Sequence, residues 1–423
     1  MAKTRIVAAI ELGSTKIATL VAQVQVDPVS FEQTINIVGA ASSLSTAINR
    51  KGQIDDIGKV VEATISSVEA AERMAGYNLD SAFVALGGAH ISSQNSNGVV
   101  AVSDPEGEIL EDDVARAVEA ASAISLPTSR ELIHILPREY IVDGEVGVKD
   151  PEGMSGVRLE VETHLITASA GEVKNYRKVL DEVGIDIEGF VFSGLASAEA
   201  VLTPTEKELG CVCVDIGGET TSIAVFTGGA LIYSGVVPIG GKNVTRDLAA
   251  ALRISLEATE KIKIALSTLK PKEKKKPYDD QLDLTKLGIS EIKKVSRRTL
   301  VEGIMGPRLN EIFAMVKLEL EKAELINKTP SGVVITGGAA ENIGAMDSAK
   351  RMLSLPVRIG KPGGLGGLVD DILVPAFATP VGLIFFGAKQ EPQEALASLA
   401  KRIRLPSKGV AGKLVEVIRD LLP

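Results

Sequence analysis

The stretch Gly210-Cys-Val-Cys-Val-Asp-Ile-Gly-Gly-Glu-Thr-Thr221 contains the pattern that decides the fold. Apolar residues run almost without a break up to Asp215, as in a strand that is buried on both faces. A turn of small and polar residues follows, and the chain returns in a second apolar run from Ser222 to Phe226. The sequence therefore predicts a β-hairpin with an acidic residue and glycines at its tip.

The same arrangement occurs near the N-terminus. Arg5-Ile-Val-Ala-Ala-Ile-Glu-Leu-Gly-Ser-Thr-Lys16 is an apolar run that reaches a polar glycine turn, and a second apolar run extends from Ile17 to Val26. Apolar residues at helical spacing from Gln53 to Ala75, with Gly76 as a stop, predict an amphipathic helix between the hairpins. One hairpin repeated about half a chain apart predicts two similar α/β domains that face each other.

The stretch from Phe83 to Thr163 departs from this plan. Short β-like runs surround one helical segment, Glu111 to Ile124, which predicts a small α/β module inserted into the first domain. We expect a first domain of residues 1–82 and 164–203, the module at 83–163, and a second domain at 204–389. Residues 246–329 would form the outer subdomain of the second domain.

Composition excludes several classes of protein. The 423 residues are 45% apolar and carry a formal net charge of −9, which is typical of a soluble protein with two or more domains. Aromatic residues make up 3% and tryptophan is absent, which argues against a nucleic-acid platform.

Cys211 and Cys213 share one face of a predicted strand and are interpreted as buried thiols in a reducing cytosol. The N-terminus lacks the apolar segment of a signal peptide, and no window has the ~18 apolar residues that span a membrane.

Two strand-to-glycine turns could bind phosphate groups, and a third could bring its backbone against a purine or ribose. Glycines let backbone N–H groups approach phosphate oxygens, while hydroxyl and ammonium groups add donors. Asp215 ends a strand and could hold Mg²⁺, through water because Mg²⁺ keeps much of its hydration. The turns lack both the G-x-G-x-x-G dinucleotide fingerprint and the P-loop pattern. Their residues are Gly13, Ser14, Thr15 and Lys16 in the first turn, Gly217, Gly218, Thr220 and Thr221 in the second, and Gly337 and Gly338 in the third.

This ordered set resembles the actin-like ATPase superfamily, and three longer segments are similar to the FtsA family of bacterial cell-division proteins: His134–Thr167, Phe192–Leu231 and Gly332–Leu353. The resemblance implies an actin-like fold that holds ATP and Mg²⁺ between two related domains. It implies that the first two turns hold phosphates, that Asp215 and Glu11 serve the metal and the chemistry, and that Gly337, Gly338 and Ala339 face the adenosine. Glu260 and Lys263 match the pair placed near ribose and base, although their spacing alone also suits a solvated helical face.

The sequence departs from the superfamily pattern at three positions. Glu11 stands where most relatives place Asp, and Glu219 replaces a third glycine and would add negative charge beside a triphosphate. Ser193 stands where relatives carry a Gln or Glu that orients the attacking water, a role that matters in phosphoryl transfer. We therefore predict a protein that binds ATP and is at most a slow ATPase.

The remaining charged groups have simpler interpretations. The lysine-rich stretch from Leu269 to Gln281 is predicted to be a solvated loop. The three histidines, His90, His134 and His164, lie far apart in the sequence and are interpreted as structural polar residues rather than metal ligands.

The C-terminal stretch from Lys401 to Pro423 carries six basic and two acidic residues in an otherwise acidic chain. Residues 390–408 are predicted to be a linker and 409–423 an amphipathic helix, whose apolar stripe could pack on the core, bind a partner or lie on anionic lipid. The FtsA-like resemblance favours the membrane. One such helix would bind weakly, so several linked in a polymer would be needed. Its predicted membrane-facing residues are Lys413, Leu414, Val417, Ile418, Arg419 and Leu421.

The resemblance implies a function as well. An FtsA-like protein would self-associate into filaments on the cytoplasmic side of the cell membrane, tether filaments of the tubulin-like protein FtsZ at the division site and recruit later division proteins. A pilus-assembly type of actin-like adaptor is the alternative. A small-molecule kinase is less favoured, because no Asp stands in a convincing sugar-site motif.

Overall fold

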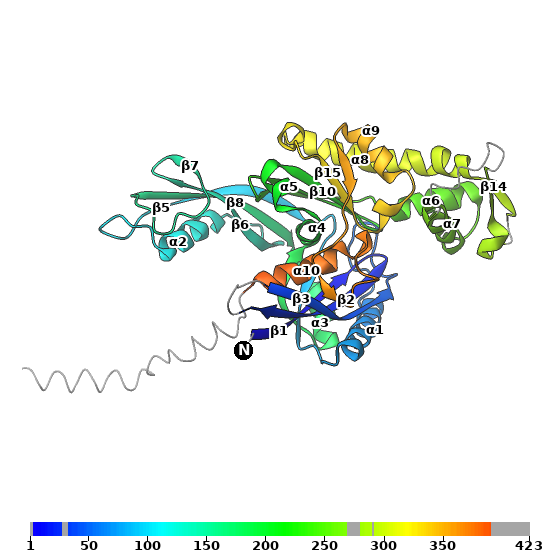
Figure 1. The fold of residues 1–423 in the computed structure, drawn as a ribbon, viewed down its shortest axis with the longest axis horizontal. Coiled ribbons are helices and arrows are strands. Elements are labelled where there is room, and N and C mark those ends of the chain that lie inside the picture. The colour runs from blue at the N-terminus through cyan, green and yellow to red at the C-terminus, as the bar shows by residue number, and fades with distance from the viewer. Residues whose placement is uncertain (1–2, 28–32, 269–279, 290–291, 391–423) are drawn as a thin grey trace, which may run out of the picture.

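The structure is a computed structural model that describes residues 3–27, 33–268, 280–289 and 292–390. Two main sheets lie on either side of helices α4 (Ser193–Val201) and α10 (Ala378–Lys389), and a smaller module projects to the left in Figure 1. Most of the predicted lysine-rich loop and nearly all of the predicted linker and tail lie outside the described residues. Within the described part of the chain, no helix is both long and apolar enough to cross a membrane.

The first sheet has six strands in the order β17-β3-β2-β1-β4-β9. β1, β2 and β3 are antiparallel neighbours, whereas β4 and β9 run parallel to β1. Helix α1 packs on this sheet, begins after the N-cap Asp56 and ends at Gly76, whose φ of 73° suits glycine. The bounds are β1 Lys3–Leu12, β2 Lys16–Val26, β3 Gln33–Leu44, α1 Ile57–Ala75, β4 Ser81–Leu86, α3 Ala170–Val183 and β9 Asp186–Phe192.

The second sheet has the order β12-β11-β10-β15-β16, with the same strand directions as β3-β2-β1-β4-β9. The prediction of two related α/β domains is therefore confirmed. The elements of this domain are α5 Pro204–Leu209, β10 Cys211–Ile216, β11 Thr221–Thr227, β12 Ala230–Val237, α6 Gly241–Leu252, α7 Leu256–Thr268, β13 Gln281–Asp283, β14 Lys294–Ser296, α8 Gly306–Lys322, β15 Val333–Thr336, α9 Ala345–Leu353 and β16 Val357–Ile359.

Strand β10 contributes to two hydrophobic cores because successive side chains on a strand point to opposite faces. Cys211 and Cys213 pack in the core shared with the first domain, whereas Val212 and Val214 pack in that of the second. Both cysteines are free and buried, as predicted, and burial raises the pKa of the Cys211 thiol to about 12. These thiols are structural.

The inserted module begins later than its apolar pattern predicts. Residues 83–86 belong to β4 and pair with β1 and β9 of the first sheet, because a continuous apolar run does not say which sheet it joins. The module is a four-stranded sheet in the order β5-β8-β6-β7 with one helix packed on it. Its elements are β5 Ser92–Ala101, α2 Glu111–Ser122, β6 Arg130–Val142, β7 Glu145–Val148 and β8 Arg158–Ser169.

The module also contacts the second domain through β12. Ser93 Oγ donates to the Ser234 carbonyl at 2.7 Å, and His164 Nε2 lies 3.0 Å from Ser234 Oγ. His134 Nε2 accepts the Phe192 N–H at 3.0 Å. Burial lowers the pKa of both histidines to about 4, which fits the structural roles predicted for them.

Before residue 390 the chain returns to the first domain. The sequence had predicted that residues 204–389 all belong to the second domain. β17 (Gly366–Gly367) pairs with β3, and α10 packs on β1 and α4. The two helices approach so closely that a Cβ at Gly382 would lie 1.7 Å from the Ala196 carbonyl oxygen. Helices α4 and α10 therefore join the two halves.

Candidate functional site

A cavity of about 830 Å³ lies between the two domains. The turns of both hairpins line it, together with the third glycine turn after β15 and the inner face of α7. The structure thus brings together residues from distant parts of the chain that the sequence singled out one by one. They are Glu11, Gly13, Ser14, Thr15, Lys16, Asp215, Gly217, Gly218, Thr220, Glu260, Lys263, Gly337, Gly338 and Ala339.

Thr221 is the predicted binding residue that does not line the cavity. It is the first residue of β11, so its side chain points to the opposite side from that of Thr220. The Thr221 hydroxyl is buried and donates to the Ile239 carbonyl at 2.8 Å. Its phosphate-binding role is corrected to a structural one, which fixes the second hairpin to the segment that follows β12.

The first hairpin supplies its own charge pair. Lys16 Nζ donates to Glu11 Oε2 at 2.8 Å and lies 4.3 Å from the centroid of the Phe377 ring. The turn is closed by the Gly13 N–H, which donates to the Lys16 carbonyl at 3.0 Å. The hairpin therefore presents an ammonium group that is already partly neutralised by its neighbour.

Asp215 in the second hairpin is held by residues that sequence reasoning missed. Its Oδ2 accepts hydrogen bonds from the hydroxyl of Ser197 on α4 and from that of Thr379 on α10, the latter at 2.9 Å. Burial raises the pKa of Asp215 to about 6; the hydrogen bonds from Ser197 and Thr379 oppose the rise, and the nearby Glu11 adds to it. A bound cation beside this buried carboxylate would stabilise its ionised form.

Two glycines allow close backbone contacts, one at this carboxylate and one at the second turn. Gly337 has a φ of 83°, and a Cβ there would lie 2.2 Å from Asp215 Oδ1. A Cβ at Gly240 would lie 2.7 Å from the carbonyl oxygens of Gly217 and Gly218. A side chain is thus excluded between Asp215 and the third turn, and another between the second turn and the start of α6. The donor set of backbone amides, hydroxyls and cations around one carboxylate suits a phosphate-bearing ligand with Mg²⁺.

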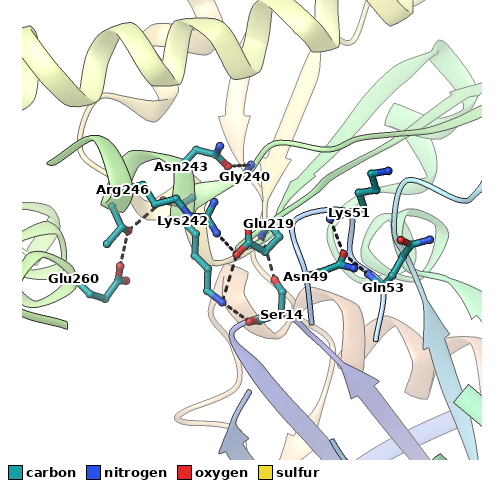
Figure 2. Close-up of polar contacts among 12 residues, drawn as sticks. Ser14, Asn49, Lys51, Gln53, Glu219, Gly240, Lys242, Asn243, Arg246 and Glu260 are labelled. Carbon is teal, nitrogen blue, oxygen red and sulfur yellow. Dashed lines mark hydrogen bonds and ion pairs between the residues drawn. The ribbon is translucent and has the colours of Figure 1, made fainter. Parts of the chain in front are cut away.

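Glu219 does not stand as an unpaired negative charge. Its carboxylate forms an ion pair with Arg246 and lies 3.7 Å from Lys242 Nζ, and both cations belong to α6 (Figure 2). The Glu219 N–H donates to Ser14 Oγ at 3.1 Å. The sequence predicted that Glu219 adds negative charge beside a triphosphate. In the structure, Lys242 and Arg246 offset this charge.

Glu260 and Lys263 form a pair at the wall of the cavity. Lys263 Nζ lies 2.8 Å from Glu260 Oε2 and donates to Thr245 Oγ1 at 2.9 Å. Lys263 is buried, so the interpretation of this pair as a solvated helical face is wrong for the lysine. Ser193 also lines the cavity, and its hydroxyl lies 3.1 Å from that of Ser222.

Known proteins similar to this chain decide its family. The family model "SHS2 domain inserted in FTSA" matches residues 88–167, and "Cell division protein FtsA" matches residues 212–382. The cell division protein FtsA of Pseudomonas aeruginosa is 35% identical over 387 residues, 92% of this chain and 90% of its own. That of Escherichia coli K12 is 35% identical over 410 residues, 94% of each chain. The chain belongs to the FtsA family.

Solved structures agree with the actin-like fold of this FtsA-family protein. The PilM-PilN type IV pilus biogenesis complex aligns with a TM-score of 0.62 at 16% identity, over 91% of this chain and 99% of that chain. MreB5 of Spiroplasma citri bound to ADP aligns with a TM-score of 0.51 at 13% identity, over 90% and 96%. At such identities the likeness concerns the fold alone. The predicted family and fold, with an insertion in the first domain, are confirmed.

The cavity of this FtsA-family chain contains two cations that the sequence patterns did not reveal. Lys242 and Arg246 follow the Gly240-Gly241 pair and lie one turn apart on α6, so both reach the second hairpin. A glycine pair that opens a helix with basic residues in its first two turns was the available signal. This signal does not by itself connect α6 with the second hairpin, because strand β12 separates the two in the sequence.

Proposed function

We propose that this FtsA-family protein binds ATP with Mg²⁺ in the cavity between its domains. The observation that carries the proposal is the convergence of two hairpin turns and a third glycine turn on one cavity of about 830 Å³. MreB5 of Spiroplasma citri, which shares the fold, was solved bound to ADP and to AMPPNP.

Each wall of the cavity would have its own task. The turns at 13–16 and 217–220 would hold phosphates, Asp215 would hold Mg²⁺, and 337–339 would face the adenosine with Glu260 and Lys263 near ribose and base. When bound, Mg²⁺ would neutralise charge on the phosphates. Ser193 offers a hydroxyl directed at Ser222 instead of a carboxylate or amide for an attacking water. We therefore expect slow hydrolysis, below the range of about 1–100 s⁻¹ typical of kinases.

The protein would act as a scaffold in cell division. It polymerises on the cytoplasmic side of the cell membrane, tethers FtsZ filaments there and helps to recruit later division proteins. Family membership, the basic residues of 401–423 and the amphipathic pattern of residues 409–423 support this proposal. A pilus-assembly adaptor is less well supported, because the likeness to PilM-PilN concerns the fold alone, whereas relatives at 35% identity are division proteins.

The test is sedimentation with anionic liposomes and FtsZ filaments, using the full chain and a variant that ends at residue 408. The full chain should bring FtsZ filaments down with the liposomes in the presence of ATP, and the shortened chain should not. FtsZ that sediments equally well with liposomes and the shortened chain would contradict tethering by the tail. Calorimetric titration with ATP and Mg²⁺ tests the nucleotide site separately.

A further inference from the structure

The tips of the two hairpins are in direct contact across the cavity. The Glu219 N–H donates to Ser14 Oγ at 3.1 Å, and Lys242 Nζ donates to the Ser14 carbonyl at 2.6 Å. A Cβ at Gly218 would lie 2.2 Å from Thr15 Oγ1. Any group that enters between the tips must therefore first break the contacts to Ser14.

The Glu219 carboxylate lies beside this contact, between two cations of α6. It is almost completely buried and is shared by Arg246 and Lys242, as Figure 2 shows. Within the described part of the chain, Glu219 Oε2 and Arg246 Nη1 are buried without a hydrogen-bond partner. Buried polar atoms are normally paired, so the free N–H of Arg246 retains donor capacity for a further anion.

Lys242 and Arg246 are tied firmly to the second hairpin. The Gly241 N–H donates to the Gly217 carbonyl at 2.9 Å, and the Lys242 N–H donates to the Gly218 carbonyl at 2.7 Å. The start of α6 and the hairpin tip thus move together. Both cations would stay beside the second hairpin when the Ser14 contacts break.

We propose that Lys242 and Arg246 bind the terminal phosphate of a nucleoside triphosphate, and that Glu219 is a built-in competitor which this phosphate displaces. The inference rests on the proposed nucleotide site. A terminal phosphate offers three oxygens and about two negative charges, more than one carboxylate, to the same two cations. A diphosphate lacks this group and leaves the Glu219 cluster closed. The two cations therefore favour a triphosphate over a diphosphate, and Glu219 reduces that preference by competing for them.

The test measures dissociation constants of Mg²⁺-AMPPNP and Mg²⁺-ADP by calorimetry with the full chain. Glu219→Gln should tighten AMPPNP binding about tenfold, because one charge-assisted interaction no longer competes, and should change ADP binding less than about threefold. Lys242→Met should weaken AMPPNP about tenfold, and Glu219→Gln added to it should have a much smaller effect. Glu208→Gln is the matched control, because Glu208 pairs with Lys149 on the surface.

The outcomes separate this inference from the proposed function. If the wild-type protein binds neither nucleotide, both proposals fail. If it binds both while Glu219→Gln shifts the two constants equally, the inference alone is overturned. A readout without nucleotide is hydrogen exchange at the Glu219 amide, which Ser14→Ala should accelerate because its acceptor is removed. Unchanged exchange in Ser14→Ala would contradict the closed contact, and circular dichroism checks that each variant folds.

Discussion

The turns of the two hairpins are closed by equivalent backbone hydrogen bonds but differ in what surrounds their acidic residues. Gly13 N–H donates to the Lys16 carbonyl in one, and Gly217 N–H donates to the Thr220 carbonyl in the other, at 3.0 and 2.9 Å. Glu11 finds its partner within its own hairpin, in Lys16. Asp215 is buried, and its partners come from α4 and α10. The same local pattern thus gives two different environments. The acid of the first domain pairs within its hairpin, whereas the acid of the second is buried and bonded to residues far away in the sequence.

The strongest test of this difference is removal of each acid. Asp215→Ala should weaken Mg²⁺-ATP binding roughly a hundredfold or more and abolish its dependence on Mg²⁺, because a direct or water-mediated metal partner is lost. Glu11→Ala should weaken binding about tenfold, since Lys16 remains to contact phosphate. Calorimetry with and without Mg²⁺ measures both. Equal losses would mean that the two hairpins are functionally equivalent.

The next test uses pH without nucleotide. The folded-state pKa of Asp215 is about 6, above its ordinary value of 3.8, so the folded protein binds this proton more tightly than the unfolded chain. Its contribution to stability is complete below about pH 4 and is lost as the pH rises through 6. The loss amounts to about 3 kcal/mol. Asp215→Asn should remove this slope and raise the free energy of unfolding at pH 7.

Urea unfolding followed by circular dichroism between pH 4 and 7.5 provides the measurement. Asp112→Asn is the control for removal of a charge, because that carboxylate is 80% exposed. Parallel pH profiles for the wild type and Asp215→Asn would show that burial of Asp215 has no such cost.

A smaller effect than the loss of Asp215 itself is expected from the residues that hold this carboxylate. Ser197→Ala should weaken Mg²⁺-dependent ATP binding roughly tenfold, a cost of about 1.4 kcal/mol that is typical of residues supporting a metal ligand. Ser193→Ala is a matched control on the same helix, since its hydroxyl faces Ser222. Magnesium titrations at fixed ATP compare the two. If Ser193→Ala reduces affinity as much as Ser197→Ala, the distant hydroxyls do not position Asp215.

Much of the fold could be predicted because it depends on local periodicity. The hairpins, the helix that ends at Gly76 and the inserted α/β module all follow from short-range patterns. The sheet that residues 83–86 join could not be predicted, because an apolar run is equally compatible with the first sheet and with the sheet of the module. Thr221 was misplaced for a similar reason: a one-residue difference along a strand decides which side a side chain faces.

The sequence by itself determined the two hairpins, their glycine turns and the family, because each depends on residues close together in the chain. Only the tertiary structure decided which groups meet across the cavity. Ser197 and Thr379 reach Asp215, and Lys242 reaches Ser14 from 228 residues away. Such contacts carry no sequence periodicity, because they arise where two separately patterned domains pack together. The charge of the site is therefore a property of the packed domains and not of either hairpin alone.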